Sequence, residues 1–597
     1  MLSELSYPFD AKAIIAGKKR LRRLLLEEKS NGRIHKKIAV LGGSTTSDIV
    51  RVLELFLLNY DIEPEFYESG YNQFYQEGMF PSDELRQFEP DFIYIHTTNR
   101  NILRLPEPTD SREKIESMLH DEMKRFSDMW SNLHQTFHCV IIQNNFDLPA
   151  YRLLGNRDVS DVHGTVNFIG KLNCAWSDYA QQHDNFYICD INYISADIGL
   201  KTWSNPQDWY LYKYAVSLAA IPALSFNVAN IIKSLLGRNK KGLVLDLDNT
   251  LWGGVIGEDG TDGIALGPEE AEGEAYLAFQ EYLKRLTSLG IILTIDSKND
   301  FENAVAGLGH PKSRLKKEDF TVIKANWESK AQNLRDTALE LNLLPESLVF
   351  VDDNPAERLN VAKQYPDVAV PVMESVADYI QIIDRSGFFE ATNISADDLN
   401  RGQMYRENME RKHFETTYED YSDYLRDLKM QAKIKSFEVP VLQRITQLTN
   451  KSNQFNLTAR RYAQEEIEAA AQDKSCITLY GTLRDRFGDN GIVSVVISHI
   501  IGNECHIDLW VMSCRVLKRD MELAMMDALI EECRLRGLKE LHGHYHPTLK
   551  NKMVKDFYQT QGFRKASEAA DGTTEWTLSL EDYILKNRFI QIIKEKG

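Results

Sequence analysis

The stretch that decides the fold is GLVLDLDNTLWGGVIGEDG, residues 242–260. It opens with an apolar run, which predicts a buried strand, and Asp246 and Asp248 follow one residue apart. Strand side chains alternate, so both carboxylates point to one side while the leucine between them points away. Two crowded carboxylates are costly unless a cation or a shared proton compensates for their charge. We therefore predict a ligand site where this strand ends, with Gly253 and Gly254 allowing a tight turn past it.

Three later stretches supply other groups that phosphoryl transfer needs. They are IILTIDSKND, which ends a strand at Ser297, NWESKAQNLRD, which begins a helix at Lys330, and SLVFVDDNPAER, which ends a strand at Asp352 and Asp353. Ligands bind outside the carboxyl ends of the strands in α/β sheets. The sequence therefore predicts a metal site with a phosphate clamp, whereas the first two aspartates taken alone are also consistent with a simple capped strand end.

The pattern along the chain predicts a multidomain α/β protein. Strands alternate with helices in both of the first two segments, which is typical of parallel sheets, and the last segment reads as consecutive antiparallel strands followed by a long helix. We expect an N-terminal α/β domain over 1–236, a second α/β domain over 237–384, a helical connector over 385–435, and an α+β domain over 436–597.

Composition limits the partners and the compartment. With 88 acidic and 70 basic residues the net charge is -18, which disfavours nucleic acid and anionic membranes as partners. The seven cysteines are scattered without a C-x-x-C pair, so they indicate neither a disulfide framework nor a zinc site. We find no secretory signal pattern and predict a cytoplasmic protein. The most apolar run, 215–232, contains Pro222 and several Ser and Asn residues, which favours a helix of a soluble protein over a membrane span.

The ordered set of D-x-D-x-T, then Ser, Lys and DD, resembles the haloacid dehalogenase (HAD) superfamily of phosphatases and phosphotransferases. The longer strings LVLDLDNTLWGGVIGEDG, FVDDNPAER, NQFNLT and LRDRFGDNG are similar to one branch, the FkbH-like proteins of HAD subfamily IIIC. This resemblance covers most of the chain. It implies an SGNH hydrolase-like N-terminal domain, a Rossmannoid HAD domain without a large cap (the C0 type), and a C-terminal domain similar to GNAT acyltransferases.

The resemblance also implies roles for the residues that match the HAD motifs. Asp246 would be the nucleophile that becomes a phosphoaspartate, and Asp248 would protonate the leaving oxygen and then activate water. Thr250 and Ser297 would bind the phosphoryl group. Lys330 would neutralise the charge of that group and of the nucleophile.

The same resemblance implies a Mg²⁺ site. The ligands would be Asp246, the backbone carbonyl of Asp248, and Asp353, an all-oxygen set that suits this ion. Asp352 would either share the metal or orient the other ligands. No insertion large enough for a cap follows the first strand, so we expect an open site. A partner macromolecule, another domain, or a neighbouring subunit of a homo-oligomer would then shape its specificity.

The N-terminal domain contains some of the residues that a serine hydrolase needs. AVLGGSTTSDI places Ser44 at a strand-to-helix turn, and Gly70 and Asn99 are the candidates for the oxyanion hole that the SGNH resemblance implies. The late D-x-x-H motif that would supply the base is missing, and without a base serine is a poor nucleophile. We therefore expect a non-hydrolytic binding domain, with the alternative that Ser44 caps a helix.

The C-terminal resemblance to GNAT proteins rests on NKMVKDFYQTQGF, with Asn551 and Tyr558. The acyl-CoA loop of that family should read Q/R-x-x-G-x-G/A. Here RVLKRD begins with Arg515 but has a lysine and an aspartate where glycines belong, which argues against ordinary acetyl-CoA use. Tyr558 or Arg519 could still contact a phosphopantetheine arm on an acyl carrier protein, and the alternative for both is packing or a solvated charge.

Three functions are compatible with these patterns. The first is a Mg²⁺-dependent phosphatase or phosphotransferase that acts on a small phosphorylated metabolite. The second follows the glyceryl-loading relatives, in which an acyl phosphate such as 1,3-bisphosphoglycerate loses phosphate and its acyl group passes to the thiol of an acyl carrier protein. Those relatives commonly carry a cysteine where this chain has Gly242. The third is a scaffold without turnover, which the complete HAD residue set argues against.

Overall fold

The computed structural model describes residues 2–27, 32–452, 454–548 and 550–593. The chain forms two compact units, Met1–Leu235 and Leu236–Gly597, and each is described by itself. Among the described residues, no helix combines the length and the apolar character that crossing a bilayer requires.

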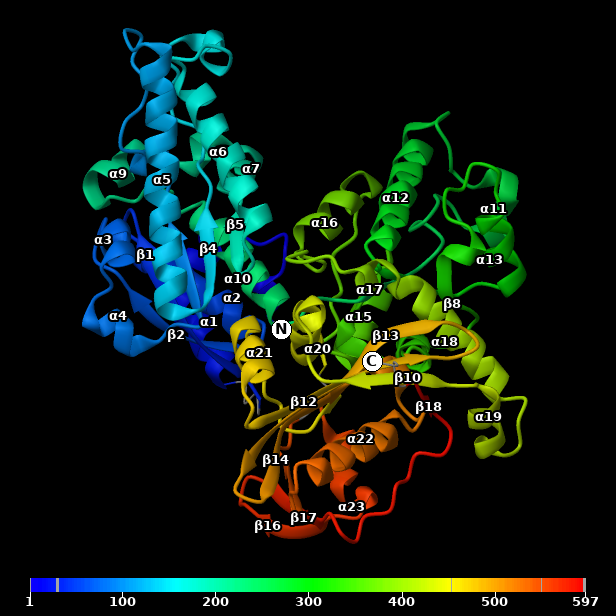
Figure 1. Cartoon of the computed structure of the whole chain (residues 1–597). Helices are drawn as coiled ribbons and strands as arrows, with labels where there is room; N and C mark the ends of the chain where they lie inside the picture. The colour runs from blue at the N-terminus through cyan, green and yellow to red at the C-terminus, as the bar shows by residue number, and fades with distance from the viewer. Residues whose placement is uncertain (1, 28–31, 453, 549, 594–597) are drawn as a thin grey trace. The chain divides into compact units, whose positions relative to one another are not determined.

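The first unit is built on a five-stranded parallel sheet in the order β2-β1-β3-β4-β5 (Figure 1). Its strands are β1 (Ile34–Gly42), β2 (Ile62–Glu68), β3 (Phe92–His96), β4 (Val140–Asn144) and β5 (Phe186–Cys189). Its longer helices are α1 (Ala11–Glu27), α2 (Ser47–Asn59), α5 (Arg112–Phe137), α6 (Thr165–Gln182) and α10 (Ile221–Leu235), and the shorter ones are α3 (Phe74–Met79), α4 (Asp83–Phe88), α7 (Ile191–Ile198), α8 (Leu200–Trp203) and α9 (Pro206–Tyr212). The apolar run 215–232 therefore lies largely in α10, which packs against α2.

Both faces of this first sheet are covered, which explains why the inner strand β3 is buried along its whole length, whereas the edge strand β2 is mostly polar and only partly buried. Helices α5 and α6 bring Phe126, Trp130 and Trp176 against the face that presents Leu41 and Ile93. The three aromatic rings contact one another at centroid distances between 4.9 and 5.7 Å.

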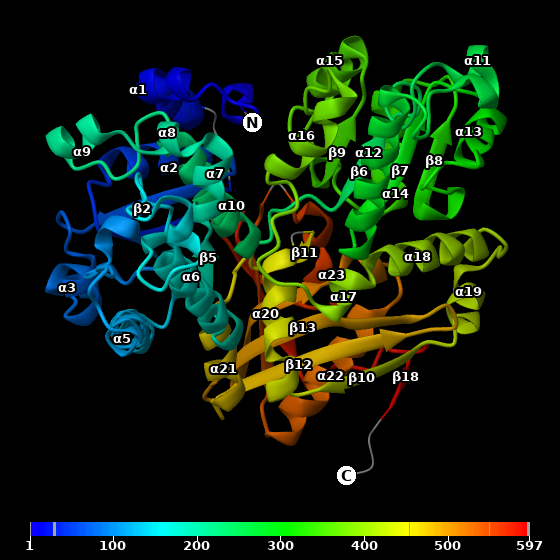
Figure 2. The same cartoon turned by 90° about the horizontal axis from the view of Figure 1, so that it is seen from above.

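The second unit begins with a four-stranded parallel sheet in the order β8-β7-β6-β9, seen at the upper right of Figure 2. The strands are β6 (Gly242–Leu245), β7 (Ile292–Ser297), β8 (Phe320–Ala325) and β9 (Leu348–Val351). The helices are α11 (Ile256–Gly263), α12 (Ala271–Ser288), α13 (Phe301–Leu308), α14 (Lys330–Glu340), α15 (Pro355–Gln364) and α16 (Tyr379–Arg385). Because β6 lies inside the sheet and is buried along its whole length, its carboxyl end is flanked by the ends of β7 and β9.

Helices α17 (Ala396–Leu399), α18 (Arg401–Glu415) and α19 (Tyr421–Asp427) follow in the segment that the sequence predicts to be a connector. Arg411 of α18 is 1% exposed, and its guanidinium donates two hydrogen bonds, of 2.7 and 2.9 Å, to the buried carboxylate of Asp485. Bidentate pairing of this kind fixes both position and orientation. The segment is therefore packed onto the sheet that follows it.

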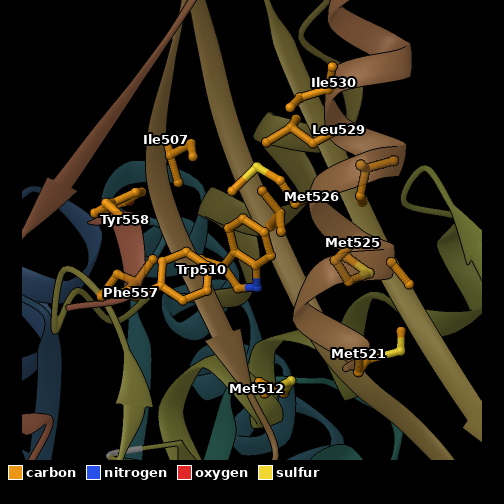
Figure 3. Close-up of a cluster of buried hydrophobic side chains, with 14 of the residues drawn as sticks. Ile507, Trp510, Met512, Met521, Met525, Met526, Leu529, Ile530, Phe557 and Tyr558 are labelled. Carbon is orange, nitrogen blue, oxygen red and sulfur yellow. The ribbon is translucent and has the colours of Figure 1, made fainter. Parts of the chain in front are cut away.

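The last part of the chain is an α+β arrangement around a nine-stranded sheet of order β16-β17-β15-β14-β13-β12-β10-β18, with β11 paired to β14. Its strands are β10 (Gln431–Lys435), β11 (Phe455–Asn456), β12 (Cys476–Arg484), β13 (Asp489–Ile501), β14 (Glu504–Met512), β15 (Glu540–Tyr545), β16 (Arg564–Glu568), β17 (Thr574–Ser579) and β18 (Gln591–Ile592). The helices are α20 (Leu442–Lys451), α21 (Gln464–Gln472), α22 (Met521–Leu535) and α23 (Phe557–Gln561). Helix α22 packs its methionines onto the sheet around Trp510 (Figure 3).

Strands β14 and β15 are parallel and pair only over Glu504–His506. Farther along β14, the short strand β11 takes over the pairing, with Phe455 opposite Met512 and Asn456 opposite Val511. The chain itself thus occupies the edge of β14 that β15 leaves.

A substitution at Gly543 of β15 would test how tightly this sheet is packed. A Cβ at this position would lie 2.2 Å from the buried ring of Tyr558. We expect Gly543→Ala to lower the free energy of unfolding by roughly 1–3 kcal/mol, the usual cost of overpacking, in urea titrations followed by tryptophan fluorescence.

Gly402→Ala is the control for Gly543→Ala. It adds a methyl group in helix α18, where, apart from the adjoining helix backbone, the nearest described atom is an Arg406 nitrogen at 3.8 Å. We expect it to be neutral or to stabilise by up to about 1 kcal/mol. Equal stability of the Gly543→Ala variant and the wild type would show that the Tyr558 ring yields at no cost.

Candidate active site

The site is built around Asp246, the first residue after β6. Its backbone N–H donates to the carbonyl of Val351 at 3.0 Å, which holds it beside the end of β9. Its side chain is buried, and its Oδ2 lies 2.7 Å from the Nζ of Lys330. That ammonium also contacts Oδ2 of Asp352 at 2.5 Å. The structure thus brings together residues that lie more than a hundred positions apart in the sequence.

Three carboxylates converge at this point. The side chains of Asp246, Asp352 and Asp353 each offer an oxygen, and these atoms lie within 4.8 Å of one another. Burial, with the negative charge of Asp246, raises the pKa of Asp352 to about 6 and also raises the pKa of Asp353. Burial opposes the charge of Lys330, but the two adjacent carboxylates outweigh it and raise its pKa. One ammonium balances only part of this charge, so the cluster fits a cation with oxygen ligands.

Asp248 stands apart from the carboxylate cluster and has its own set of donors. Its Oδ1 accepts from the indole N–H of Trp252 at 2.9 Å and from the backbone N–H of Ile256 at 3.1 Å, and its Oδ2 accepts from the amide of Asn299 at 3.1 Å. Burial nevertheless raises the pKa of Asp248. A carboxyl with a raised pKa, fixed in orientation by three donors, is suited to carry a proton in acid/base catalysis.

Two hydroxyl residues complete the predicted set. Ser297 is the last residue of β7 and is 2% exposed, while Thr250 is fully buried in the turn after β6. The hydroxyl of Thr250 has no hydrogen-bond partner in the part of the chain that the structure describes. A buried hydroxyl without a partner costs free energy, and a ligand oxygen would satisfy it.

The turn between Asp246 and α11 is held by tyrosines that the sequence did not single out. Asn249 adopts a left-handed backbone with φ of 55°, and its carbonyl accepts hydrogen bonds from the hydroxyls of Tyr276 at 3.2 Å and Tyr379 at 3.1 Å. Gly254 follows with φ of 90°, as expected for the tight turn, and its N–H donates to the Asn249 side chain at 2.9 Å. These bonds set the direction in which Asp248 points.

Two further buried side chains were missed by the sequence reasoning. Asn299 positions Asp248, and Asp296 lies one residue before Ser297 with its Oδ1 accepting from Asn333 at 3.0 Å. Burial raises the pKa of Asp296 to about 8. The available signal was an aspartate inside an otherwise apolar strand, where an unpaired charge is rare.

Comparisons with known proteins agree with this geometry. The family model "FkbH, N-terminal domain" matches residues 37–233. A solved structure from Bacteroides fragilis, the N-terminal part of the protein BF1531 containing a phosphatase domain complexed with Mg, is 30% identical with a TM-score of 0.58, and the match covers 63% of this chain and 99% of that one. The chain belongs to the FkbH-like HAD phosphatases. This confirms the family that the sequence motifs predict.

Other matches are more distant. The ribosomal-protein-S18-alanine N-acetyltransferase from Escherichia coli is 14% identical, with 28% of this chain and 99% of that chain covered and a TM-score of 0.21. The PaiA N-acetyltransferase from Thermoplasma acidophilum, in complex with coenzyme A, is also 14% identical, with 25% and 99% covered and a TM-score of 0.19. At these TM-scores the likenesses carry no weight for activity. No curated protein matches the sequence of this FkbH-like chain.

The structure of the N-terminal unit of this FkbH-like chain shows the contacts made by the predicted serine and its two predicted partners. Ser44 is 2% exposed and its hydroxyl has no partner in the described part of the chain. The alternative that Ser44 caps a helix is wrong, because Thr46 occupies the N-cap position of α2. The amide of Asn99 donates to Asp147 at 2.8 Å, while Asn101, which we did not predict, donates to the carbonyl of Gly43 at 2.8 Å beside the serine.

The third predicted member of that set, Gly70, lies in the bend after β2, where its carbonyl accepts from the backbone N–H of Gln73 at 3.1 Å. Close to the serine, Thr45 donates to the carbonyl of Tyr212 at 2.7 Å, so the segment expected to carry D-x-x-H does reach the serine turn. It contains no histidine. The non-hydrolytic binding role of this domain stays a prediction.

The four residues that the GNAT resemblance makes candidates for an acyl-carrier or CoA site, Arg515, Arg519, Asn551 and Tyr558, are buried in internal contacts. Arg519 bonds to Asp485 at 3.1 Å and to Asn408 at 2.6 Å. Asn551 is 1% exposed and donates to the carbonyl of Asn456 at 2.9 Å, which helps to hold β11 in place.

The other two candidates for the acyl-carrier or CoA site are buried as well. Tyr558 is fully buried beside Phe557, on the far side of Trp510 from the methionines (Figure 3). Arg515 is 7% exposed, bonds to Ser513 at 3.2 Å, and faces a cavity.

That cavity has a volume of about 100 Å³ and a strongly basic wall. Its charged lining residues are Lys241, Asp398, Arg401, Arg444, Lys451 and Arg515, five bases against one acid, and Cys514 also lines it. Burial lowers the pKa of Lys451 to about 8 even though Asp398 lies 3.1 Å from it. This concentration of positive charge, in a chain with a net charge of -18, favours an anionic occupant.

The buried carboxyl of Asp296 gives a pH dependence of stability. Its folded pKa of about 8 lies above the usual value of an unfolded aspartate, so its contribution is fully present below about pH 4 and is lost as the pH rises through about 8. Without metal, we expect the free energy of unfolding of Asp296→Asn to match that of the wild type most closely near pH 4, before the contribution of the protonated carboxyl is lost, and to exceed it near pH 9 by a few kcal/mol at most. Urea unfolding in chelator measures this.

Asp336→Asn, which alters an exposed carboxylate on α14, is the control for Asp296→Asn and should follow the wild type at both pH values. If the free energy of unfolding changes with pH in the same way in the Asp296→Asn variant and in the wild type, Asp296 is not protonated in the folded protein.

Proposed function

We propose that the protein is a Mg²⁺-dependent phosphohydrolase that acts through a phosphoaspartate on a small phosphorylated metabolite. One observation carries the proposal, namely the convergence of Asp246, Asp352 and Asp353 beside Lys330. A structural cluster would not retain such mutually repelling buried carboxylates. The same argument speaks against a scaffold without turnover.

Asp246, Asp353 and the backbone carbonyl of Asp248 would hold the metal, and Asp352 would orient Lys330 or share the ion. The donors are all oxygen atoms, which fits Mg²⁺, and the Bacteroides fragilis phosphatase domain was solved with that ion. When bound, the ion supplies charge neutralisation for the transferring phosphoryl group.

The side chains divide the chemistry between them. A carboxylate oxygen of Asp246 attacks phosphorus while Asp248 gives its proton to the leaving oxygen, and the phosphoryl group stays on Asp246. Thr250, Ser297 and Lys330 bind the phosphoryl oxygens. Asp248 then takes a proton from water, whose oxygen attacks phosphorus and releases phosphate with Asp246 regenerated.

The substrate approaches an open site. Only α11, α12 and short turns lie between β6 and β7, and only α13, one turn of 3-10 helix and β8 lie between Ser297 and Lys330. Neither interval holds a cap domain that would enclose the substrate. A partner protein, or a neighbouring subunit of a homo-oligomer, would supply the missing wall.

The nucleophile and the acid are separable by mutation. We expect Asp246→Asn to lower Mg²⁺-dependent phosphate release by at least about 10³-fold, since the covalent step is lost. Asp248→Asn should lower kcat/KM, which reports the steps up to the phosphoaspartate, much more for an alkyl phosphate than for p-nitrophenyl phosphate, whose leaving group needs no proton. Phosphate release with Mg²⁺ and with chelator measures both effects.

Asp336→Asn controls for the change of charge. Retained turnover in Asp246→Asn would remove the phosphoaspartate, and an equal loss of kcat/KM on both substrates would remove the acid role of Asp248.

A second candidate function is acyl transfer, favoured by the basic cavity that contains Cys514. In such a relay the thiol of Cys514 attacks the acyl carbon of an acyl phosphate, the C–O bond breaks, phosphate leaves, and the thiol proton passes to solvent. The carrier thiol then attacks the thioester carbonyl and gives its proton to the departing Cys514 thiolate, and the 3-phosphate that remains on an acyl group from 1,3-bisphosphoglycerate is hydrolysed at the Asp246 site. Lys241 precedes β6 and Asp246 follows it, so cavity and phosphatase site lie at opposite ends of one strand. An acyl group would have to travel on a mobile arm, which an acyl carrier protein provides.

The two candidates are distinguished by Cys514→Ser. With 1,3-bisphosphoglycerate and an acyl carrier protein, a relay through this thiol predicts a glyceryl mass gain on the carrier that disappears in Cys514→Ser, while release from simple phosphate esters persists. Cys174→Ser, at an exposed thiol, is the control. If the carrier gains no mass with the wild type, only the phosphohydrolase function remains. If the gain persists in Cys514→Ser, the Cys514 thiol does not take part in the transfer.

A further inference from the structure

Histidines form a row across three strands of the large sheet. His499 of β13 lies opposite His506 of β14, which lies opposite His542 of β15. The rings stack, with centroids 5.3 Å apart in the first pair and 4.4 Å apart in the second. Two residues before His506 and His542 on strands β14 and β15, Glu504 lies opposite Glu540. None of these residues belongs to the phosphatase site or to the basic cavity.

Two of the imidazoles converge on one carboxylate oxygen. The Nε2 atoms of His506 and His542 each lie 3.4 Å from Oε2 of Glu504. Both nitrogens are buried, and neither has a hydrogen-bond partner in the described part of the chain. A separation of 3.4 Å is longer than the usual 2.7–3.2 Å of an N–H···O bond. Leaving two buried nitrogens without hydrogen bonds costs free energy, and a ligand bound between these nitrogens and the Glu504 oxygen would remove that cost.

The spacing fits a tetrahedral metal ion. With metal–nitrogen distances of about 2.0–2.1 Å and metal–oxygen distances of about 2.0–2.2 Å, tetrahedral angles separate the ligand atoms by about 3.3–3.5 Å. The two nitrogen-to-oxygen distances are both 3.4 Å, and all three ligand atoms lie within 4.8 Å of one another. Imidazole nitrogens select zinc over the Mg²⁺ that an all-oxygen cluster selects.

We propose that Glu504, His506 and His542 bind a zinc ion. The three side chains project from paired strands, so the sheet preorganises them. Three protein ligands leave the fourth position open to water or to another ligand, an arrangement typical of sites that bind or activate a small molecule. Glu540, with Oε2 3.6 Å from His542 Nε2, is the nearest additional carboxylate.

Cobalt substitution of the full chain tests the proposal. Metal-free protein is first saturated with Mg²⁺ to fill the aspartate cluster and is then titrated with Co²⁺. We expect one equivalent of Co²⁺ to produce the intense visible absorption of a four-coordinate ion, and one equivalent of Zn²⁺ to abolish it. His506→Ala and His542→Ala should each weaken binding by more than the roughly 10–100-fold that removing a mere hydrogen-bond partner of a ligand costs.

His499→Ala is the matched control, because His499 stands in the same row and bonds to Asp508 at 2.7 Å but is outside the ligand set. The His499→Ala variant should bind Co²⁺ with the affinity of the wild type. Glu504→Gln, at a side chain 46% exposed, removes a ligand with little risk to folding and should also lose the absorption. Absence of four-coordinate Co²⁺ in the wild type, or its persistence in both Glu504→Gln and His506→Ala, would overturn the site and leave an ion-paired cluster.

Discussion

The ammonium of Lys330 lies between two buried carboxylates, and much of the second unit serves to hold them there. Asp246 and Asp352 follow adjacent strands, β6 and β9, so the pairing of the parallel sheet itself forces the two charges together. The lysine enters from the first turn of α14, and helix, sheet and charges are thereby mutually dependent. A position of this kind tolerates few residues, because a shorter or neutral side chain would leave two like charges buried side by side.

The second carboxylate of the D-x-D pair is kept out of this cluster by the turn that follows the strand. Trp252, Ile256 and Asn299 provide three donors that draw Asp248 away from Asp246, and the tyrosines on the Asn249 carbonyl fix the chain between them. Two aspartates separated by one residue thus acquire different surroundings. Their division into nucleophile and acid follows from local hydrogen bonding, because the side chains are chemically identical.

The sequence was sufficient to predict the parallel sheets and the order of the phosphatase residues, because strand ends in such sheets are marked by a switch from apolar to polar residues. It did not reveal Asn299 or Asp296, since a single polar residue near a strand end has no distinctive spacing. Arg519 looked available for a ligand and is instead paired with Asp485, a contact made across 34 residues. The histidine row was invisible for the same reason, because cross-strand neighbours depend on register, which a search for cysteine and histidine spacing cannot detect.

Strand β11 has a consequence for any extended ligand of the large sheet. Where β15 leaves β14, the backbone groups of β14 are already bonded to residues 455 and 456 of the same chain. A tethered segment acts at a high effective concentration, so an external strand or arm competes against it at a disadvantage. Asn551 adds a further bond to the Asn456 carbonyl and increases that disadvantage. The edge of β14 that β15 leaves is therefore covered by β11, and another strand could pair there only after this short segment is released.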